Sequence, residues 1–397
     1  MNIENKKEIR YYFFIMCIYF FTFQNAIQKI VPIFQYWDEI FAILLIPVLI
    51  VYSIKSKGRI LVKKYNLIII ISLLILVFSG LYSNIKYKYQ TLELVFNDLL
   101  LVLKFFMAYF ISELVFKIDY MEKERKKISK HIKLITIFLF IMTILNYIFN
   151  LYDGEIRYGI KSNKLFYEHP TYLSAVCVGL LANLIIFEKK INKKYTYIIL
   201  FILATTVRVK TIGFIFAFLC LIYFVDKKNK KLTFSKIGIV ALITIAITYE
   251  QLEFYFLKNN DFARSVLLNT SIKIANDYFP FGTGFATYGS YNSIKNYSPI
   301  YLRYGINNIY GLEKGKAYFV SDCFWPMILG QFGYIGFILY ILCILFIFKK
   351  IQKQYRTETK YLYIAKITCL LYLLISSTSE SAFVNPISMP LAIILGM

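Results

Sequence analysis

Residues 325–348 read WPMILGQFGYIGFILYILCILFIF, an unbroken apolar stretch of 24 residues without a charged side chain. A helix rises about 1.5 Å per residue, so this stretch is long enough to cross the ~30 Å hydrocarbon core of a bilayer. Its apolar and polar residues do not alternate with the period of two that a membrane β-strand requires. The stretch therefore predicts a membrane-spanning α-helix.

The rest of the chain repeats this pattern of apolar blocks. Of its 397 residues, 58% are hydrophobic, and a soluble chain of this length would carry more charge. Internal repeats and low-complexity linkers are absent, so we expect a single integral membrane domain over residues 1–397. The sequence predicts an all-α polytopic membrane protein with about twelve transmembrane helices (10–12), assigned to residues 11–27, 39–54, 66–83, 98–116, 134–151, 171–187, 195–207, 211–225, 236–250, 325–348, 361–377 and 383–397.

Lys and Arg are distributed unevenly between alternate loops. Of these 46 residues, 29 lie in the short segments that include residues 1–10 and 117–133, and 15 lie in the other set, which includes residues 251–320. The positive-inside rule then places both termini in the cytoplasm and the large loop 251–320, between the ninth and tenth spans, outside a bacterial cell membrane. The net charge of +23 thus reflects topology and contact with membrane lipids, not nucleic-acid binding. The first span lacks a small-residue cleavage site, so we expect it to be retained.

The sequence offers few ligands for a metal ion. Its six cysteines lie in or beside apolar segments without paired spacing, and we interpret them as small buried residues. The two histidines, His131 and His169, are far apart, and the close acidic pair Glu122 and Glu124 lies in a lysine-rich loop. We therefore expect no protein-built metal site and no cofactor.

Two predicted outer segments carry polar residues at the ends of spans. In the first, Glu168 and His169 precede Pro170, a residue that suits the first position of a helix. Such a helix start can bind a phosphate group, although a simple capping role explains it equally well. In the second, Arg208 and Lys210 form a basic tip on the side where cations are disfavoured. An anionic ligand accounts for this tip, and snorkelling to lipid headgroups is the alternative.

The external stretch 251–320 is rich in aromatic residues and glycine. Arg264 leads into an expected amphipathic helix, Ser265 to Asp277, and a glycine turn flanked by aromatics follows at residues 280–285. Aromatic faces and tyrosine hydroxyls suit sugar rings, but the same residues could lie at the membrane interface. We expect Arg157, Arg303 and Tyr288 to contact a glycan.

Asp322 lies where the tenth span leaves the outer face. It is either a helix N-cap or a general base beside a cationic cavity. The glycines 330, 333 and 336 that follow are spaced for close helix packing. Within the spans, Lys104, Glu113 and Lys366 lie near the ends, which predicts snorkelling. No chain of buried carboxylates is apparent, and this disfavours a secondary transporter.

Taken in order, these segments resemble bacterial O-antigen and capsule polymerases, the Wzy-like family, and the related O-antigen ligases. The resemblance rests on a His-Pro motif entering one span, an Arg-x-Lys tip two spans later, an Arg ahead of Pro-x-Gly-x-Gly, and an acidic residue before the last glycine motif. It covers residues 157–340, whereas the first five spans match in hydropathy alone. The corresponding positions are His169, Arg208, Arg264 and Asp322. Ligases commonly carry a histidine near the position of Asp322, and this difference favours a polymerase.

The resemblance implies a GT-C-like membrane glycosyltransferase that joins undecaprenyl-pyrophosphate-linked glycans at the outer face of the cytoplasmic membrane. Arg208, Lys210 and Arg264 would bind the pyrophosphate, and Asp322 would act as the general base, with His169 or Glu168 as the alternative. Other polysaccharide-assembly proteins, such as a flippase and a chain-length regulator, are the expected partners. A ligase and a lipid-linked oligosaccharide flippase stay open as alternatives.

Overall fold

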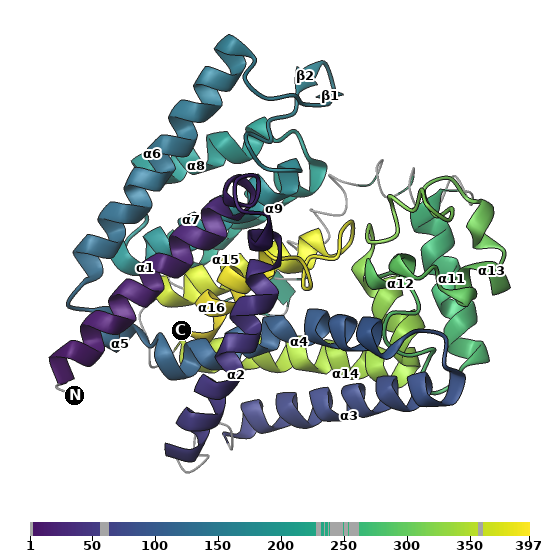
Figure 1. The fold of residues 1–397 in the computed structure, drawn as a ribbon. Coiled ribbons are helices and arrows are strands. Elements are labelled where there is room, and N and C mark those ends of the chain that lie inside the picture. The colour runs from purple at the N-terminus through teal and green to yellow at the C-terminus, as the bar shows by residue number, and fades with distance from the viewer. Residues whose placement is uncertain are drawn as a thin grey trace.

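The computed structural model describes residues 3–55, 63–227, 262–355 and 360–397, together with isolated residues between 228 and 261. Over these ranges almost all of the regular secondary structure is helical (Figure 1). The N-terminal helices are α1 (Ile3–Gln28), η1 (Pro32–Tyr36), α2 (Trp37–Lys55), α3 (Lys64–Tyr87), α4 (Leu92–Val115), α5 (Ile118–Met121) and α6 (Arg125–Phe149). A two-stranded antiparallel ribbon, β1 (Ile156–Arg157) and β2 (Ile160–Lys161), separates them from the rest.

The second half of the chain is also helical. The next elements are α7 (Pro170–Glu188), α8 (Lys193–Thr205), α9 (Val209–Leu221) and the π-helical turn η2 (Ile222–Lys227). After the undescribed stretch come α11 (Ala263–Asp277), α12 (Asn292–Lys295), α13 (Pro299–Arg303) and the 3-10 turn η4 (Ile306–Asn308). The chain ends with α14 (Phe324–Gln354), α15 (Lys360–Ser376) and α16 (Ser388–Gly396).

Six helical segments of the described chain are long and apolar enough to cross a membrane. They are Lys64–Tyr87, Leu92–Val115, Arg125–Phe149, Pro170–Glu188, Val209–Asp226 and Phe324–Gln354. The prediction of an all-α membrane protein is confirmed at this level, whereas the count of twelve and the GT-C-like fold stay predictions. The predicted ninth span, 236–250, and the first part of the predicted external loop, 251–261, lie almost entirely outside the described residues.

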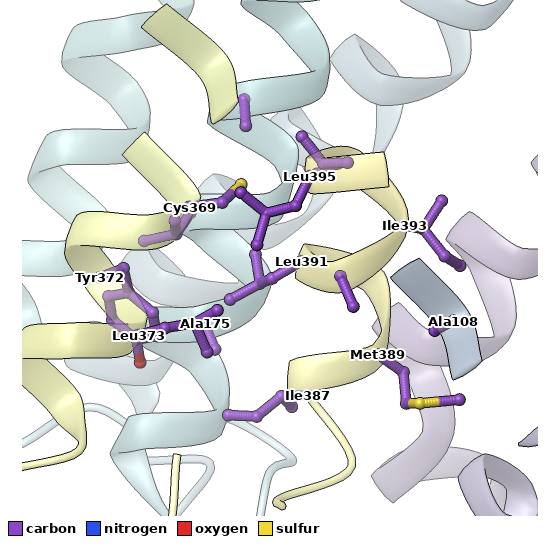
Figure 2. Close-up of a cluster of buried hydrophobic side chains, with 14 of the residues drawn as sticks. Ala108, Ala175, Cys369, Tyr372, Leu373, Ile387, Met389, Leu391, Ile393 and Leu395 are labelled. Atoms are coloured by element: carbon purple, nitrogen blue, oxygen red, sulfur yellow. The ribbon is translucent and has the colours of Figure 1, made fainter. Parts of the chain in front are cut away.

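The predicted twelfth span, residues 383–397, is corrected by the structure. Its helix α16 has nine residues, and at about 1.5 Å per residue it covers less than half of a bilayer core. The segment is nevertheless apolar on every face, because other helices surround it (Figure 2). Leu391 and Leu395 lie toward α15 and α7 on one side. Met389 and Ile393 lie toward Ala108 of α4 on the other. Protein, not lipid, covers this helix, and hydropathy alone does not distinguish the two.

Among the described residues, the contacts between loops stay within each of the two predicted sets. At one end of the bundle, hydrogen bonds and ion pairs join residues of loops 84–97, 152–170, 208–210, 251–320 and 378–382. At the other end, Lys189 pairs with Glu122, and Lys360 pairs with Asp226. The alternation of the loops therefore agrees with the structure. Which end faces outward stays a prediction.

Charged residues within the helices are paired rather than snorkelling, which corrects the prediction for Lys104, Glu113 and Lys366. Lys104 is 1% exposed and forms an ion pair with Asp38 of α2. Glu113 pairs with Lys350 of α14 at 2.5 Å, and Lys366 donates to Gln354 Oε1 at 3.0 Å. Buried carboxylates are thus present in the helices. Their described contacts lead to separate partners, as expected for structural ion pairs.

Residues 262–320 of the predicted external loop fold around a small core of their own. Helices α11, α12 and α13 lie beside the ends of α3, α4 and α14 (Figure 1). Tyr288 belongs to this core: it is fully buried, stacks on Tyr301 and donates its hydroxyl to Leu267 O at 2.6 Å. Its predicted role in glycan binding is therefore corrected, because no face of the ring is exposed to a sugar.

Polar residues near the helix ends hold this unit to the bundle. Asn84 of α3 donates to Phe285 O at 3.0 Å and accepts from Phe285 N at 2.7 Å. The buried Asp98 of α4 accepts from Ala286 N at 2.8 Å and from Asn292 Nδ2 at 3.0 Å. Because unpaired backbone groups are costly to bury, these side chains fix the position of the loop that follows α11.

The glycines of α14 make room for this loop. At Gly333 the helix is interrupted (φ 63°, ψ −167°), and a Cβ there would lie 2.4 Å from Pro280 O. A Cβ at Gly330 would lie 2.5 Å from the ring of Tyr288. The prediction that these glycines serve helix–helix packing is thus wrong for both positions, where the neighbour is the loop of residues 280–288.

Candidate functional site

His169 caps the start of α7. Its Nδ1 accepts a hydrogen bond from Thr171 N at 3.3 Å and lies 2.7 Å from Thr171 Oγ1, and Pro170 occupies the first helical position as expected. With Nδ1 as the acceptor, the neutral ring carries its proton on Nε2. Burial, and then the charges of Arg208 and Lys210, lower the pKa of His169 to about 3. The ring is therefore neutral near pH 7 and only weakly basic.

The predicted basic tip lies directly beside this helix start. Val207 adopts a left-handed conformation (φ 49°), which a β-branched residue rarely does, and Arg208 then caps α9. Ser174 of α7 bonds with Thr211 of α9 at 3.1 Å, and this contact ties the two helix starts together. The local geometry therefore directs the Arg208 and Lys210 side chains toward the start of α7.

Both cations of the tip have carboxylate partners. Arg208 Nη2 lies 3.3 Å from Glu155 Oε2, and Lys210 Nζ lies 2.9 Å from Glu380 Oε2. The side chains of Arg208 and Lys210 are only 10% and 12% exposed. Snorkelling to lipid headgroups is therefore excluded as the explanation for this tip.

Arg264 and Asp322 form a third ion pair at the same place. Arg264 lies in the first turn of α11, at the start of the expected amphipathic helix, and its Nη2 donates to Asp322 Oδ2 at 2.9 Å. Asp322 is not the N-cap of α14, because Cys323 occupies that position. Burial raises the pKa of the Asp322 carboxyl above its usual value, although the charge of Arg264 works against this.

The three ion pairs form one cluster, which we call the cation cluster: Arg208, Lys210 and Arg264 with Glu155, Asp322, Glu380 and His169. The charge of Lys210 acts on both His169 and Asp322, and the charge of Glu380 acts on Asp322. Ser381 N and Oγ donate to Ser321 O at 3.1 and 2.8 Å, and hold the Glu380 segment against the Asp322 segment. Four positions matched through the resemblance, His169, Arg208, Arg264 and Asp322, thus come together.

Glu380 and Glu155 were missed by the sequence analysis. Glu380 lies in the short segment Thr378-Ser379-Glu380-Ser381-Ala382, the one predicted outer loop that contains no Lys or Arg. An acidic residue in a predicted outer loop without Lys or Arg was the sequence feature that could have indicated a partner for the cations. Burial works to raise the pKa of Glu155, but the hydrogen bond from Arg157 and the charge of Arg208 outweigh it and lower the pKa. Both carboxylates are therefore suited to balance the cations.

The remaining predicted residues occupy different places. Arg157 pairs with Glu155 at 2.8 Å and borders the cluster. Arg303 instead lies on the surface of the α11–α13 unit, where it donates to the hydroxyls of Tyr278 at 2.7 Å and Tyr89 at 3.3 Å, away from the cluster. Glu168 turns away from the tip, accepts from Gln28 Nε2 at 2.6 Å and lines a cavity of about 630 Å³.

Within the described residues, no three His, Cys, Asp or Glu side chains are grouped so that they could hold a metal ion. All six cysteines are unpaired, and five of them are buried, as expected. Comparison with protein-family models finds no match to the chain, and no curated protein matches its sequence. The chemistry of the site is therefore argued from its residues.

Proposed function

We propose that this protein is a polysaccharide polymerase of the bacterial envelope. It would transfer an undecaprenyl-pyrophosphate-linked glycan onto a lipid-linked repeat unit at the outer face of the cytoplasmic membrane. The observation that carries the proposal is the convergence of Arg208, Lys210 and Arg264 with His169 and Asp322, from four segments far apart in the sequence. The sequence resemblance to the Wzy-like family supplies the class of substrate.

The cation cluster suits a pyrophosphate. A guanidinium binds phosphate oxygens through two parallel hydrogen bonds, and Lys adds a compact charge. In the absence of substrate the cations are balanced by Glu155, Glu380 and Asp322, so an incoming pyrophosphate would take over bonds that the carboxylates now make. Arg157, which borders the cluster, adds a fourth cation to these three carboxylates, so the formal charge of the site is +1 with a neutral His169. The site therefore favours an anion.

The reaction needs one bond made and one broken. An acceptor hydroxyl attacks the anomeric carbon of the donor sugar, and the bond from that carbon to the pyrophosphate oxygen breaks. The electron pair leaves with the polyprenyl pyrophosphate, where Arg208, Lys210 and Arg264 stabilise the developing charge. The proton of the hydroxyl passes to a carboxylate of the site.

Asp322 is the carboxylate that fits this role best. It is 30% exposed, whereas Glu380 is 11% exposed, and its raised pKa brings it closer to the value that general base catalysis requires. His169 is a poorer base, because its pKa of about 3 is low and its Nδ1 is occupied in capping α7. We therefore assign the base to Asp322, and we assign the capping and shaping of the helix start to His169.

The proposal is tested by the glycans of a strain deleted for this gene. Surface glycan that collapses to a single repeat unit supports a polymerase. Long chains that accumulate on lipid without reaching the surface indicate a ligase, and repeat units retained on the inner leaflet indicate a flippase. Unchanged surface glycan contradicts all three.

Complementation with variants then tests the site itself. Arg208→Ala and Arg264→Ala should each lower polymer yield by about 10²-fold or more, as for the loss of one donor to a developing charge. Lys316→Ala is the matched control, because Lys316 is an exposed cation of the same unit outside the cluster. Full polymer from both Arg variants, with normal protein levels in the membrane, contradicts the assignment.

A further inference from the structure

The structure contains a cavity of about 630 Å³ that is separate from the cation cluster. It lies between the ends of α1, α2 and α4, and is bordered by the start of α7, by α12 and by residues 386–387. Its volume is in the range of small-molecule sites, and is larger than a single sugar ring requires. Apart from the start of α7 and α12, none of these lining elements belongs to the segments that suggested a function in the sequence.

The lining of the cavity is rich in polar side chains. Side-chain amides are concentrated there, and each presents both a donor and an acceptor without net charge. Tyrosine rings lie among them, and their faces can pack against the apolar C–H faces of sugars. The amides are Gln24, Asn25, Gln28, Gln35, Asn97 and Asn292, and the tyrosines are Tyr36, Tyr167, Tyr172 and Tyr291.

Half of these amides are held in place by the protein. Gln24 Nε2 donates to Asp38 Oδ1 at 3.3 Å, Gln28 Nε2 to Glu168 Oε1 at 2.6 Å, and Asn292 Nδ2 to Asp98 Oδ1 at 3.0 Å. The side-chain amides of Asn25, Gln35 and Asn97 make no hydrogen bond with any residue of the described ranges. All three are at least partly exposed. The amides of Asn25, Gln35 and Asn97 are therefore available to bind a polar ligand, in a site whose other three amides are already held in place.

The charges of the cavity differ from those of the cation cluster. Glu39 and Glu168 line the cavity, and Lys295 is the one cation among its lining residues, so the cavity lacks the several cations of the cluster. Lys104 lies 3.4 Å from Glu39 and holds that carboxylate in place. A pyrophosphate is disfavoured in such surroundings, whereas hydroxyl and acetamido groups are not.

Two elements connect the cavity to the cation cluster. Glu168 and Tyr172 line the cavity and flank His169, and the segment that carries Glu380 continues to Pro386 and Ile387 in the cavity wall. Tyr172 lies within the electrostatic reach of Glu168 and Glu380. A chain of sugars attached to a pyrophosphate could therefore extend from the cation cluster into the cavity.

We propose that this cavity is the subsite for the sugar rings of the glycan, that its ligand is an uncharged oligosaccharide, and that Asn25, Gln35 and Asn97 contact it directly. This inference rests on the proposed function for the origin of the glycan. It predicts a division of the substrate: the pyrophosphate binds to Arg208, Lys210 and Arg264, and the sugars bind to amides and tyrosines.

The test uses the full-length protein in lipid nanodiscs and a probe without phosphate. The probe is the free repeat-unit oligosaccharide, released by mild acid from the lipid-linked fraction of the same bacterium, and binding is measured by calorimetry. The double variant Gln35→Ala/Asn97→Ala should weaken binding about tenfold through the loss of two hydrogen bonds. Asn307→Ala is the control, because Asn307 is a partly exposed amide outside the cavity.

Each outcome is decisive. Binding that weakens in the double variant but not in Asn307→Ala supports the cavity as a sugar subsite. Binding that is absent in the wild-type protein, or unchanged in the double variant, overturns it. Unchanged surface glycan in the gene-deleted strain overturns the polymerase proposal separately, because oligosaccharide binding to the cavity does not depend on transfer.

Discussion

Lys210 and Glu380 form an ion pair that joins the start of α9 to the segment before α16, with Nζ and Oε2 2.9 Å apart. The two side chains are 12% and 11% exposed, so water screens them little. Glu380 Oε1 has no hydrogen-bond partner among the described residues. The pair is therefore both a structural connection and, in the proposed reaction, a place where an anionic substrate would compete with a carboxylate for a cation.

Removal of either partner of this pair should destabilise the protein. Lys210→Met leaves a buried carboxylate and Glu380→Met leaves a buried ammonium, and each should cost about 3–5 kcal/mol in the free energy of unfolding. The double variant Lys210→Met/Glu380→Met should recover most of this loss, since it buries no charge. Thermal unfolding in detergent measures the three variants.

The double variant also separates structure from function. If Lys210 binds pyrophosphate, the double variant should insert and fold but form little polymer. Polymer at the wild-type level from a folded double variant would assign the pair a structural role alone.

Part of this site could be predicted from the sequence. The cations stand in short motifs, and a cation in a predicted outer loop is unexpected, so the sequence alone identifies Arg208 and Lys210 as site candidates. Glu380 was not, because nothing in a stretch of Ser and Thr indicates that it folds back onto α9. The ion pair of Lys104 with Asp38 could not be predicted either, because a single sequence does not show which residues of different helices lie together. The nine-residue α16 was mistaken for a span because burial in protein and burial in lipid select the same residues.

Asp322 should determine the acid side of the pH–rate profile. A general base must be ionised, and the pKa of Asp322 lies above the ordinary value of 3.8, so the transfer rate should fall on acidification at a higher pH than a normal Asp would cause. Asp322→Asn should lower the rate by about 10²–10⁴-fold and remove this pH dependence. Initial rates with lipid-linked donor in proteoliposomes, from pH 4 to 8, measure both effects.

Arg264→Lys is the matched variant for the Asp322 experiment. It keeps the positive charge beside Asp322 but loses the forked geometry, so it should affect the rate without abolishing the acid limb. If the Asp322→Asn protein keeps the full rate, Asp322 is not the general base, and Glu380 becomes the candidate for that role.

His169 should act through structure, and the choice of substitution can demonstrate this. His169→Asn keeps a good N-cap and should retain most of the activity, whereas His169→Ala should destabilise the protein by about 1 kcal/mol. Equal loss of activity in both variants, at equal stability, would instead indicate a direct role of the imidazole.

The low pKa of His169 also predicts a pH dependence of stability. The unfolded chain takes up a proton near pH 6.5, and the folded protein does so only near pH 3. Stability should therefore fall as the pH is lowered from about 6.5 toward 3, because the unfolded state binds more protons in this window. His169→Asn should lose less stability than the wild-type protein between pH 6.5 and 5, as measured by thermal unfolding. A wild-type protein and a variant with parallel pH profiles would contradict the buried, neutral state of the ring.

Gly333 should be among the least replaceable positions of α14. Its positive φ disfavours any side chain, and a Cβ would meet Pro280 O at 2.4 Å, so Gly333→Ala should cost about 3 kcal/mol or more. Gly305→Ala shares the positive φ (66°) but faces open space, and should cost about 1 kcal/mol. Because the loop at Pro280 continues from α11, displacing it should also weaken the contact between Arg264 and Asp322 and lower polymer yield. Equal unfolding free energies for the two alanine variants would show that, in the membrane-embedded protein, the loop at Pro280 does not contact α14 at Gly333.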